Sequence, residues 1–331
     1  MRAVVIETPG GLDHLQLKDV PEPRPGPGEV AIEVHFAACN WSDIQKREGV
    51  YPTPITYPII LGLEVSGRIA EVGPGVRGLK PGDRVAAFTG PYMAGGFADR
   101  CLVGAEYIIK LPEDVPLKLG AAFPVATLTA YHLLHSAHRV RKGEAILIHA
   151  VGGAVGLMLT QLARNAGARV IGTVSFAGKG ARASAYGAER IVVHDEEDFV
   201  AAALEFTAGK GVDLVIDSLG GDILERSFDA LRTYGRIINI GEAAGYPTFD
   251  IRPKLYERST SLAGFELHHA APGSARWRRG VRHVLDAMSS GRLEVPIEAV
   301  YPLEAVRDAQ ARLGARGVSG KLLLKVTRET S

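Results

Sequence analysis

The sequence predicts an α/β protein in which a β-rich part and a doubly wound parallel sheet share one chain of 331 residues. Up to about residue 120, short strand-like runs alternate with Pro- and Gly-rich turns, which is typical of β-rich domains. From residue 121 onward, strand and helix patterns alternate and the strands are almost continuously apolar. This second pattern indicates a parallel sheet covered on both faces, so we expect two domains.

In the β-rich part, strands are predicted over residues 1–6, 29–36, 68–72 and 84–88. In the part that follows, helices are predicted over 121–136, 155–166, 176–186, 199–207 and 224–231. The strands between them are predicted over 145–150, 168–174, 191–193, 212–216 and 236–240. After about residue 265 the patterns predict an Arg-rich helix (278–288), a strand around Val300, a helix (303–313) and a final strand (321–326).

The composition excludes several classes of protein. Hydrophobic residues make up 46% and charged residues 23%, as in an ordinary globular protein. A net charge of +1 provides no global field to attract nucleic acid or an anionic membrane. Two cysteines, Cys39 and Cys101, are too few for a disulfide framework or a four-thiolate zinc site. With no apolar run of about 18 residues and no signal-peptide layout, we expect a cytoplasmic protein.

A glycine-rich turn separates a predicted strand from a predicted helix. The strand over 145–150 runs into Val151, and the turn continues through Gly152, Gly153, Ala154, Val155 and Gly156. Missing side chains let the backbone approach a pyrophosphate, and a helix N-terminus offers it free N–H groups and partial positive charge. Val151 interrupts the G-x-G-x-x-G pattern, so a glycine turn without a ligand is the alternative. The position of the turn at the start of repeated strand–helix units favours a dinucleotide site.

The end of the second strand of this series indicates which dinucleotide binds. Sites for NAD usually carry Asp or Glu there to hold the ribose 2′-hydroxyl, but residues 172–179 contain no carboxylate. Ser175 supplies a hydroxyl, Lys179 a cation, and Arg182 follows three residues later. These groups favour the 2′-phosphate of NADPH. The alternative is that Ser175 only caps a helix and Lys179 is a solvated charge.

Together these features resemble the medium-chain dehydrogenase/reductase superfamily and, within it, the zinc-independent quinone oxidoreductase branch. The resemblance covers nearly the whole chain and rests on the order and spacing of short motifs. These are Asn40-Trp41-Ser42-Asp43, Gly62-Leu63-Glu64-Val65-Ser66-Gly67, Gly82-Asp83-Arg84-Val85, the glycine turn, Asp217-Ser218-Leu219-Gly220-Gly221 and Ser319-Gly320-Lys321. The resemblance implies a GroES-like catalytic domain of residues 1–121 and 265–331, around a Rossmann dinucleotide-binding domain of residues 122–264.

Two positions differ from the alcohol dehydrogenase branch of that superfamily. Asn40 stands where that branch has a zinc-ligating Cys, and Leu63 where it has a zinc-ligating His. Leucine cannot bind a metal, an amide is a poor zinc ligand, and Cys39 would point to the opposite side of an extended segment. We therefore expect no metal site. Without a Lewis acid, hydride transfer needs an electron-poor acceptor, such as a quinone or an α,β-unsaturated carbonyl.

The resemblance also suggests residues near the reacting atoms. Tyr51 resembles a cleft tyrosine of quinone reductases and related enoyl-thioester reductases, where the phenol would stabilise an enolate or donate a proton. Asn40 would hold the cofactor or an acceptor oxygen. Thr129 resembles a position near the nicotinamide amide, and Arg316 an arginine that reaches the cofactor phosphate. The structural alternatives are a tyrosine packed on prolines, a turn-capping amide, a threonine bonded to its own helix and a loop charge.

Other polar residues have less specific patterns. Asn239 and Gly241 end the last predicted strand of the parallel sheet, where strand ends meet ligands. Glu64 is either a supporting group of the site or only a strand charge. The series His132, His135 and His138 spreads around a helix and is not expected to hold a metal. His268 and His269 are candidates to face the substrate pocket, which the sequence does not decide, and the Arg-rich stretch 276–279 is expected to be a solvated helix face.

The sequence thus predicts an NADPH-dependent, zinc-independent reductase of a small-molecule quinone or enone, without a nucleic-acid or membrane partner. Two alternatives stay open: an enoyl-thioester reductase, and a catalytically silent NADPH-binding protein. The resemblance further suggests a homodimer.

Overall fold

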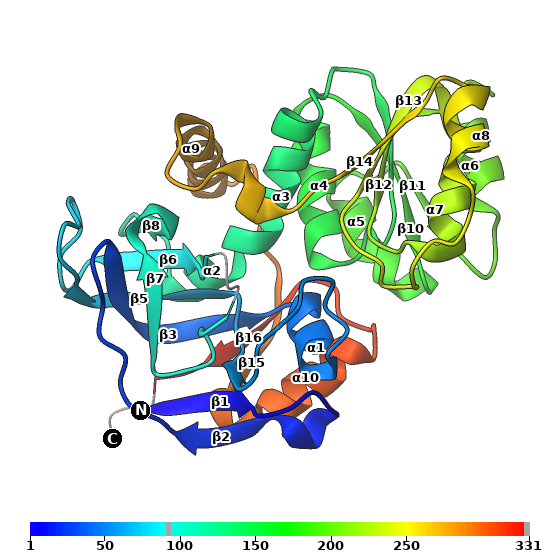
Figure 1. Ribbon diagram of the computed structural model, residues 1–331. Coiled ribbons are helices and arrows are strands. Elements are labelled where there is room, and N and C mark those ends of the chain that lie inside the picture. Colours follow the sequence, from blue (N-terminus) through cyan, green and yellow to red (C-terminus); the bar gives the residue numbers. More distant parts are fainter. Residues whose placement is uncertain (91–93, 328–331) are drawn as a thin grey trace. The chain divides into compact units, whose positions relative to one another are not determined.

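The computed structural model describes residues 1–90 and 94–327, and the chain divides into two compact units. The first unit comprises Met1–Val125, Ala271–Leu285 and Val295–Ser331. The second comprises Ala126–Ala270 and Asp286–Glu294. The predicted α/β class is confirmed, because the first unit is built on mainly antiparallel sheets and the second on a parallel one (Figure 1).

The first unit contains two sheets. The smaller sheet consists of β1 (Arg2–Ile6), β2 (Gln16–Asp19) and β4 (Ile59–Ile60), in the order β2-β1-β4. The strands of the larger sheet are β3 (Glu29–Cys39), β5 (Glu64–Val72), β6 (Arg84–Phe88), β7 (Arg100–Gly104), β8 (Ile108–Lys110), β15 (Ile297–Pro302) and β16 (Lys321–Lys325). Their order is β15-β16-β3-β5-β6-β8, and β7 pairs with β3.

The pairing of β16 with β3 connects strands that are almost 300 residues apart in the sequence. The strands are antiparallel, with Leu323 opposite Ala38 and Leu322 opposite Cys39. Alternate residues of the strands are fully buried in one apolar core, among them Val30, Ile32 and Leu324. β16 therefore belongs to the same sheet as β3, the strand that leads into Asn40.

The first unit contains α1 (Trp41–Glu48), α2 (Leu117–Ala122) and α10 (Val306–Gly314), whereas α3 (Pro124–His132) and α9 (Ala275–Ser289) each include residues of both units. The prediction of one helix over 121–136 is wrong in its continuity: α2 ends before Phe123, α3 starts at Pro124, and a π-helical turn covers Leu133–Ala137. Proline has no N–H to donate to the preceding turn, so it starts a helix and cannot continue one.

The second unit contains a six-stranded parallel sheet. Its strands are β9 (Ala145–Ile148), β10 (Arg169–Val174), β11 (Arg190–Val193), β12 (Val212–Asp217), β13 (Leu231–Asn239) and β14 (Ser261–Gly264), in the order β11-β10-β9-β12-β13-β14. Its helices are α4 (Ala154–Asn165), α5 (Ala181–Ala185), α6 (Phe199–Phe206), α7 (Gly221–Ser227) and α8 (Ile251–Glu257). The strand order reverses between β9 and β12, and such reversal points are where doubly wound sheets bind ligands.

Helices cover both faces of this sheet. Figure 1 shows α4 and α5 on one face and α6, α7 and α8 on the other. On the second of these faces, Phe199 and Ala203 of α6 pack with strand residues such as Leu147 and Val215. The continuous apolar character of the strands follows from this two-sided burial.

Two predicted helices of this unit differ from the structure. Residues 176–186 form a 3₁₀ turn (Ala177–Gly180) followed by the short α5, because two glycines within five residues weaken a continuous α-helix. The predicted helix 224–231 instead starts at Gly221 and ends at Ser227, and β13 already starts at Leu231. The register of β13 against β12 shifts after Leu231, where Tyr234 has a positive φ of 62°. Because of this interruption, the sequence pattern predicted only the second half of the strand.

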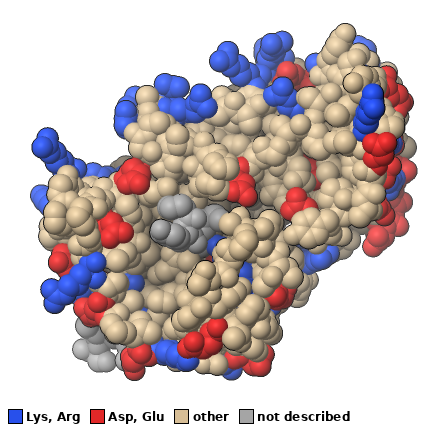
Figure 2. Space-filling view, in the orientation of Figure 1, with Lys and Arg blue, Asp and Glu red and all other residues tan. Residues whose placement is uncertain are grey.

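The surface carries charges of both signs. Figure 2 shows Lys and Arg side chains interspersed with Asp and Glu over the visible face. Arg276, Arg278 and Arg279 are exposed on α9, whereas Trp277 is buried. Among the described residues, none of the helices has both the length and the apolar character that crossing a bilayer requires.

Candidate functional site

The glycine turn lies between β9 and α4, with Gly153 as the N-cap of the helix. At Gly156, a β-carbon would lie 2.6 Å from Cα of Val151, so only glycine lets the helix pack this closely on the turn. At Gly172 in β10, a β-carbon would meet the side chain of Val151 at 2.4 Å. The valine at the first glycine position of the motif thus fills a space that glycines on the helix and the next strand leave open.

The turn is also covered by Lys179. A β-carbon at Gly152 would lie 2.3 Å from the carbonyl oxygen of Lys179 and 2.7 Å from its Cγ. The structure therefore brings together two features that the sequence suggested separately, the glycine turn and the cation after the second strand. Ser175 is exposed in the same connection, and the N-cap of the 3₁₀ turn is Phe176. Ser175 is thus not the N-cap of the turn that follows β10.

His149 fixes the start of this turn. Its Nδ1 lies 3.0 Å from Oγ1 of Thr173 in β10, and its Nε2 lies 2.9 Å from Oγ of Ser227 in α7. Burial lowers the pKa of His149 to about 3, so the ring is neutral at pH 7 and bridges two hydroxyl groups. The role of this histidine is not evident from the sequence, because its partners lie 24 and 78 residues away.

The carboxyl ends of β12 and β13 carry a second polar group. Nδ2 of Asn239 donates to Oδ2 of Asp217 at 2.8 Å and to the carbonyl of Gly241 at 3.1 Å. Burial raises the pKa of Asp217, against the opposing effect of N–H groups from Leu219 and Gly220 and of Asn239. The predicted residues Asn239 and Gly241 therefore meet at one strand end, and the amide holds the turn that follows β13.

Two hydroxyl groups stand out by their surroundings. Oγ1 of Thr127 in α3 and Oγ of Ser42 in α1 are both shielded from solvent, and neither has a hydrogen-bond partner among the residues described. Buried hydroxyls are normally paired, so each is a candidate to bond a bound molecule. Thr129, which the sequence suggested for the nicotinamide, is buried on the same helix as Thr127.

A buried charge network surrounds Asn40. The ammonium of Lys321 lies 2.5 Å from Oε1 of Glu64 and donates to Oδ1 of Asn40 at 2.8 Å. Nδ2 of Asn40 donates to the same Glu64 oxygen at 3.1 Å, and the N–H of Val125 donates to Oε2 of Glu64 at 2.7 Å. The side chains of Glu64 and Lys321 are 0% and 3% exposed. Glu64 is therefore a buried carboxylate and not a charge on the surface of its strand. The amide of Asn40 is hydrogen-bonded to both members of the Glu64–Lys321 ion pair.

This network decides whether a zinc ion fits at the position where alcohol dehydrogenases hold one. Asn40 offers an amide that is already bonded, and Leu63 is an apolar buried side chain. The ammonium of Lys321 supplies the positive charge next to Glu64. Zinc in proteins takes thiolate, imidazole and carboxylate ligands, so this donor set does not fit the ion.

A second buried pair lies in α1, next to Tyr51. Asp43 is fully buried and accepts the N–H of Asn40 at 2.8 Å, and Lys46 is fully buried three residues later. Burial raises the pKa of Asp43 to about 6, opposed by Lys46, and burial lowers the pKa of Lys46 to about 8, opposed by Asp43. Nζ of Lys46 lies 5.0 Å from the centre of the Tyr51 ring, within cation–π range. The half-buried tyrosine thus packs on an ammonium group.

The remaining candidates have separate surroundings. Arg316 is exposed, has a positive φ of 59° and lies over Trp41 at 5.9 Å, in the first unit. Nδ1 of His132 lies 2.9 Å from Oγ of Ser136. Nε2 of His138 lies 2.9 Å from Glu144. These two histidines of the three-histidine series therefore have different partners.

Comparison with known proteins identifies the two parts of the chain. Residues 26–113 match the family described as alcohol dehydrogenase GroES-like domain, and residues 154–286 match the zinc-binding dehydrogenase family. The chain is 33% identical over 329 residues to a 2-haloacrylate reductase of Burkholderia sp, covering 97% of this chain and 98% of that one. It is 33% identical over 324 residues to a probable quinone oxidoreductase of Schizosaccharomyces pombe, covering 97% and 96%. The crystal structure of an Escherichia coli quinone oxidoreductase complexed with NADPH superposes with a TM-score of 0.93 at 30% identity, covering 98% of this chain and 100% of that one.

The Glu64–Lys321 pair generates a stability prediction. Lys321→Met leaves Glu64 buried without its cation, and we expect the free energy of unfolding to fall by about 3–5 kcal/mol. The double variant Lys321→Met/Glu64→Gln is expected to recover part of this loss, because it leaves no charge unpaired. Urea denaturation measures both. Lys18→Met is the control: its ion pair with Glu7 is exposed, so less than about 1 kcal/mol is expected. Equal effects of Lys321→Met and Lys18→Met would contradict the assignment.

The Asp43 carboxyl generates a pH prediction. Its pKa is raised from the ordinary 3.8 to about 6, so the folded protein binds the extra proton more tightly than the unfolded chain does. This contribution to stability is present below about pH 4 and is lost as the pH rises to about 6, by up to about 1.4 kcal/mol per pH unit. Asp43→Asn is expected to lack this slope in unfolding free energies measured between pH 4 and pH 7. Asp13→Asn, at a side chain that is 83% exposed, should keep it. Parallel curves for wild type and Asp43→Asn would refute the assignment.

Proposed function

Because the chain belongs to the medium-chain dehydrogenase/reductase superfamily, in its quinone oxidoreductase branch, we propose that it is an NADPH-dependent reductase that transfers hydride to a quinone or an α,β-unsaturated carbonyl. The observation that carries the proposal is the packing of Lys179 on Gly152, which places a cation beside the glycine turn next to the reversal point of the parallel sheet.

The cofactor would be held mainly by the second unit. Diphosphate recognition is assigned to the turn residues Gly152 and Gly153 and to Ala154, Val155 and Gly156, which form the first turn of α4. Ser175 and Lys179 are assigned to the 2′-phosphate, since the end of β10 carries no carboxylate that would repel it. Thr129, Asn239 and Gly241 are assigned to the nicotinamide side. When bound, NADPH supplies the hydride.

The first unit would supply the groups that handle the acceptor. Tyr51, packed on the Lys46 ammonium, is assigned to the oxygen that gains charge as the hydride arrives. Asn40 lines the acceptor side and is held in place by Lys321. Arg316 is assigned to the cofactor phosphate, on the resemblance alone. The donor set around Asn40 does not suit zinc, so we propose zinc-independent chemistry and acceptors that are already conjugated.

We propose that residues 122–264 serve as the dinucleotide-binding domain and that residues 1–121 and 265–331 serve as the catalytic domain. We propose a cytoplasmic homodimer. β14 is an edge strand of the parallel sheet, with β13 as its single partner in that sheet among the described residues, so its outer edge is free to pair with a second copy.

A turnover assay tests the function. We expect the purified protein to oxidise NADPH in the presence of 1,4-benzoquinone or a simple enone, because both acceptors delocalise the incoming charge. Loss of absorbance at the nicotinamide band is the measurement, with heat-denatured protein as control. Turnover of crotonyl-coenzyme A alone would assign the chain to enoyl-thioester reduction instead. Thermal stabilisation by NADPH without turnover of any acceptor would identify a silent binding protein.

The preference for NADPH is tested at Lys179. Lys179→Met keeps the aliphatic stem that covers Gly152 and removes the charge. We expect the KM for NADPH to rise on the order of tenfold, since a hydrogen bond to a charged group contributes about 1.5–3 kcal/mol, and the KM for NADH to stay the same. Lys210→Met, at an exposed lysine of the same unit, is the matched control. An unchanged KM for NADPH, or equal use of NADH by the wild type, would rule out the assignment of Lys179 to the 2′-phosphate.

A further inference from the structure

The chain that leaves β14 carries three potential metal ligands within four residues. The N–H of Phe265 still donates to the carbonyl of Asn239 at 3.0 Å, so the edge of the sheet extends one residue beyond Gly264. Glu266 follows, and a 3₁₀ turn over Leu267–Ala270 presents His268 and His269. The carboxylate and the two imidazoles are therefore fixed to the C-terminal edge of the parallel sheet.

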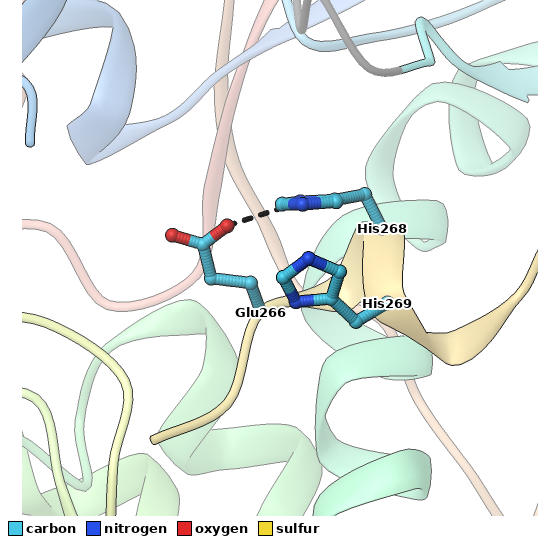
Figure 3. Close-up of side chains that lie close together, drawn as sticks. All are labelled: Glu266, His268 and His269. Carbon is cyan, nitrogen blue, oxygen red and sulfur yellow. Dashed lines mark ion pairs between the residues drawn. The ribbon is translucent and has the colours of Figure 1, made fainter. Parts of the chain in front are cut away.

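These side chains converge. One ligand atom from each of Glu266, His268 and His269 lies within 4.8 Å of the other two. Nδ1 of His268 is 3.1 Å from Oε2 of Glu266, and the two imidazole centres are 3.9 Å apart. Figure 3 shows the three side chains directed toward one another.

Nδ1 of His268 is the second observation that points to a ligand. The atom is shielded from solvent, and it lies within ion-pair distance of Oε2 of Glu266 but makes no well-oriented hydrogen bond to any residue that the structure describes. Its separation from the Glu266 oxygen is that of neighbouring ligands, since bonds of 2.0–2.1 Å at the tetrahedral angle set ligand atoms roughly 3.3 Å apart. Glu266 and His269 are exposed, so their side chains have room to rotate toward this separation.

We propose that Glu266, His268 and His269 form a binding site for one divalent transition-metal ion of the zinc type. Two imidazoles and one carboxylate are a known three-ligand set for zinc, which leaves a fourth position for water. Imidazole ligands select zinc, copper or nickel over magnesium and calcium, which prefer oxygen ligands.

The site lies in the second unit and uses none of the residues assigned to NADPH or to the acceptor, so its existence does not depend on the proposed reductase activity.

Calorimetric titration of the tag-free, chelator-treated protein with ZnCl₂ tests the site. We expect one Zn²⁺ per chain and no heat of binding with MgCl₂. His268→Ala and His269→Ala should each weaken zinc binding on the order of tenfold or more, since even residues that only support a ligand contribute this much. Glu266→Gln keeps the shape of the side chain and should weaken binding through the loss of charge. His283→Ala, at an exposed histidine of α9, is the matched control and should bind zinc like the wild type.

The thermal midpoint supplies a second readout that needs no activity. Zinc should raise it in the wild type and in His283→Ala, and not in His268→Ala/His269→Ala, whose own midpoint without metal should match that of the wild type. Absence of zinc binding by the wild type would overturn the proposal. So would unchanged binding by the double variant, because the ion would then be held elsewhere.

Discussion

The carboxylate of Glu64 is the constraint on which the first unit depends. A buried charge is costly unless it is paired and fully hydrogen-bonded, so its partners have to be in place whenever the protein is folded. Those partners come from three other parts of the chain: Lys321 of β16, Asn40 after β3, and the N–H of Val125 in the first turn of α3. A single side chain thereby fixes the mutual positions of a central strand, the C-terminal strand, the turn that carries Asn40 and the start of α3.

Much of the fold was predictable because each unit buries its strands in a characteristic way. The parallel strands are covered on both faces and read as apolar runs, so β9, β10 and β12 were placed to within two residues at each end. Local interruptions were harder to see. Pro124 divides one Ala- and Leu-rich segment into two helices, and the irregular stretch around Tyr234 separates Leu231 from the apolar end of its own strand. Periodicity describes regular elements, and it fails where one residue changes the path of the chain.

The candidate site was predictable where its residues are neighbours in sequence. The glycine turn was evident, but its contact with Lys179 depends on how β10 and the 3₁₀ turn after it pack. The amide of Asn40 was considered for a ligand, and it proved to be bonded to Lys321, which lies 281 residues away. Ser42 and Thr127 gave no signal, because an unpaired hydroxyl is recognised only once its surroundings are known. The sequence thus indicates the chemistry of the site. The folded structure determines which polar side chains can still form a hydrogen bond with a bound molecule.

The pairing of β16 with β3 also sets an order of events on the ribosome. The parallel sheet is complete once Gly264 has been made, whereas β3 receives its last neighbour only with residues 321–325. At about 5–20 residues per second, translation of the intervening stretch takes roughly 3–12 seconds. During that interval the nascent chain presents an open strand edge and a carboxylate without its ammonium partner. The synthesis of β16 therefore determines how long the emerging polypeptide is exposed to misassembly with other newly made chains.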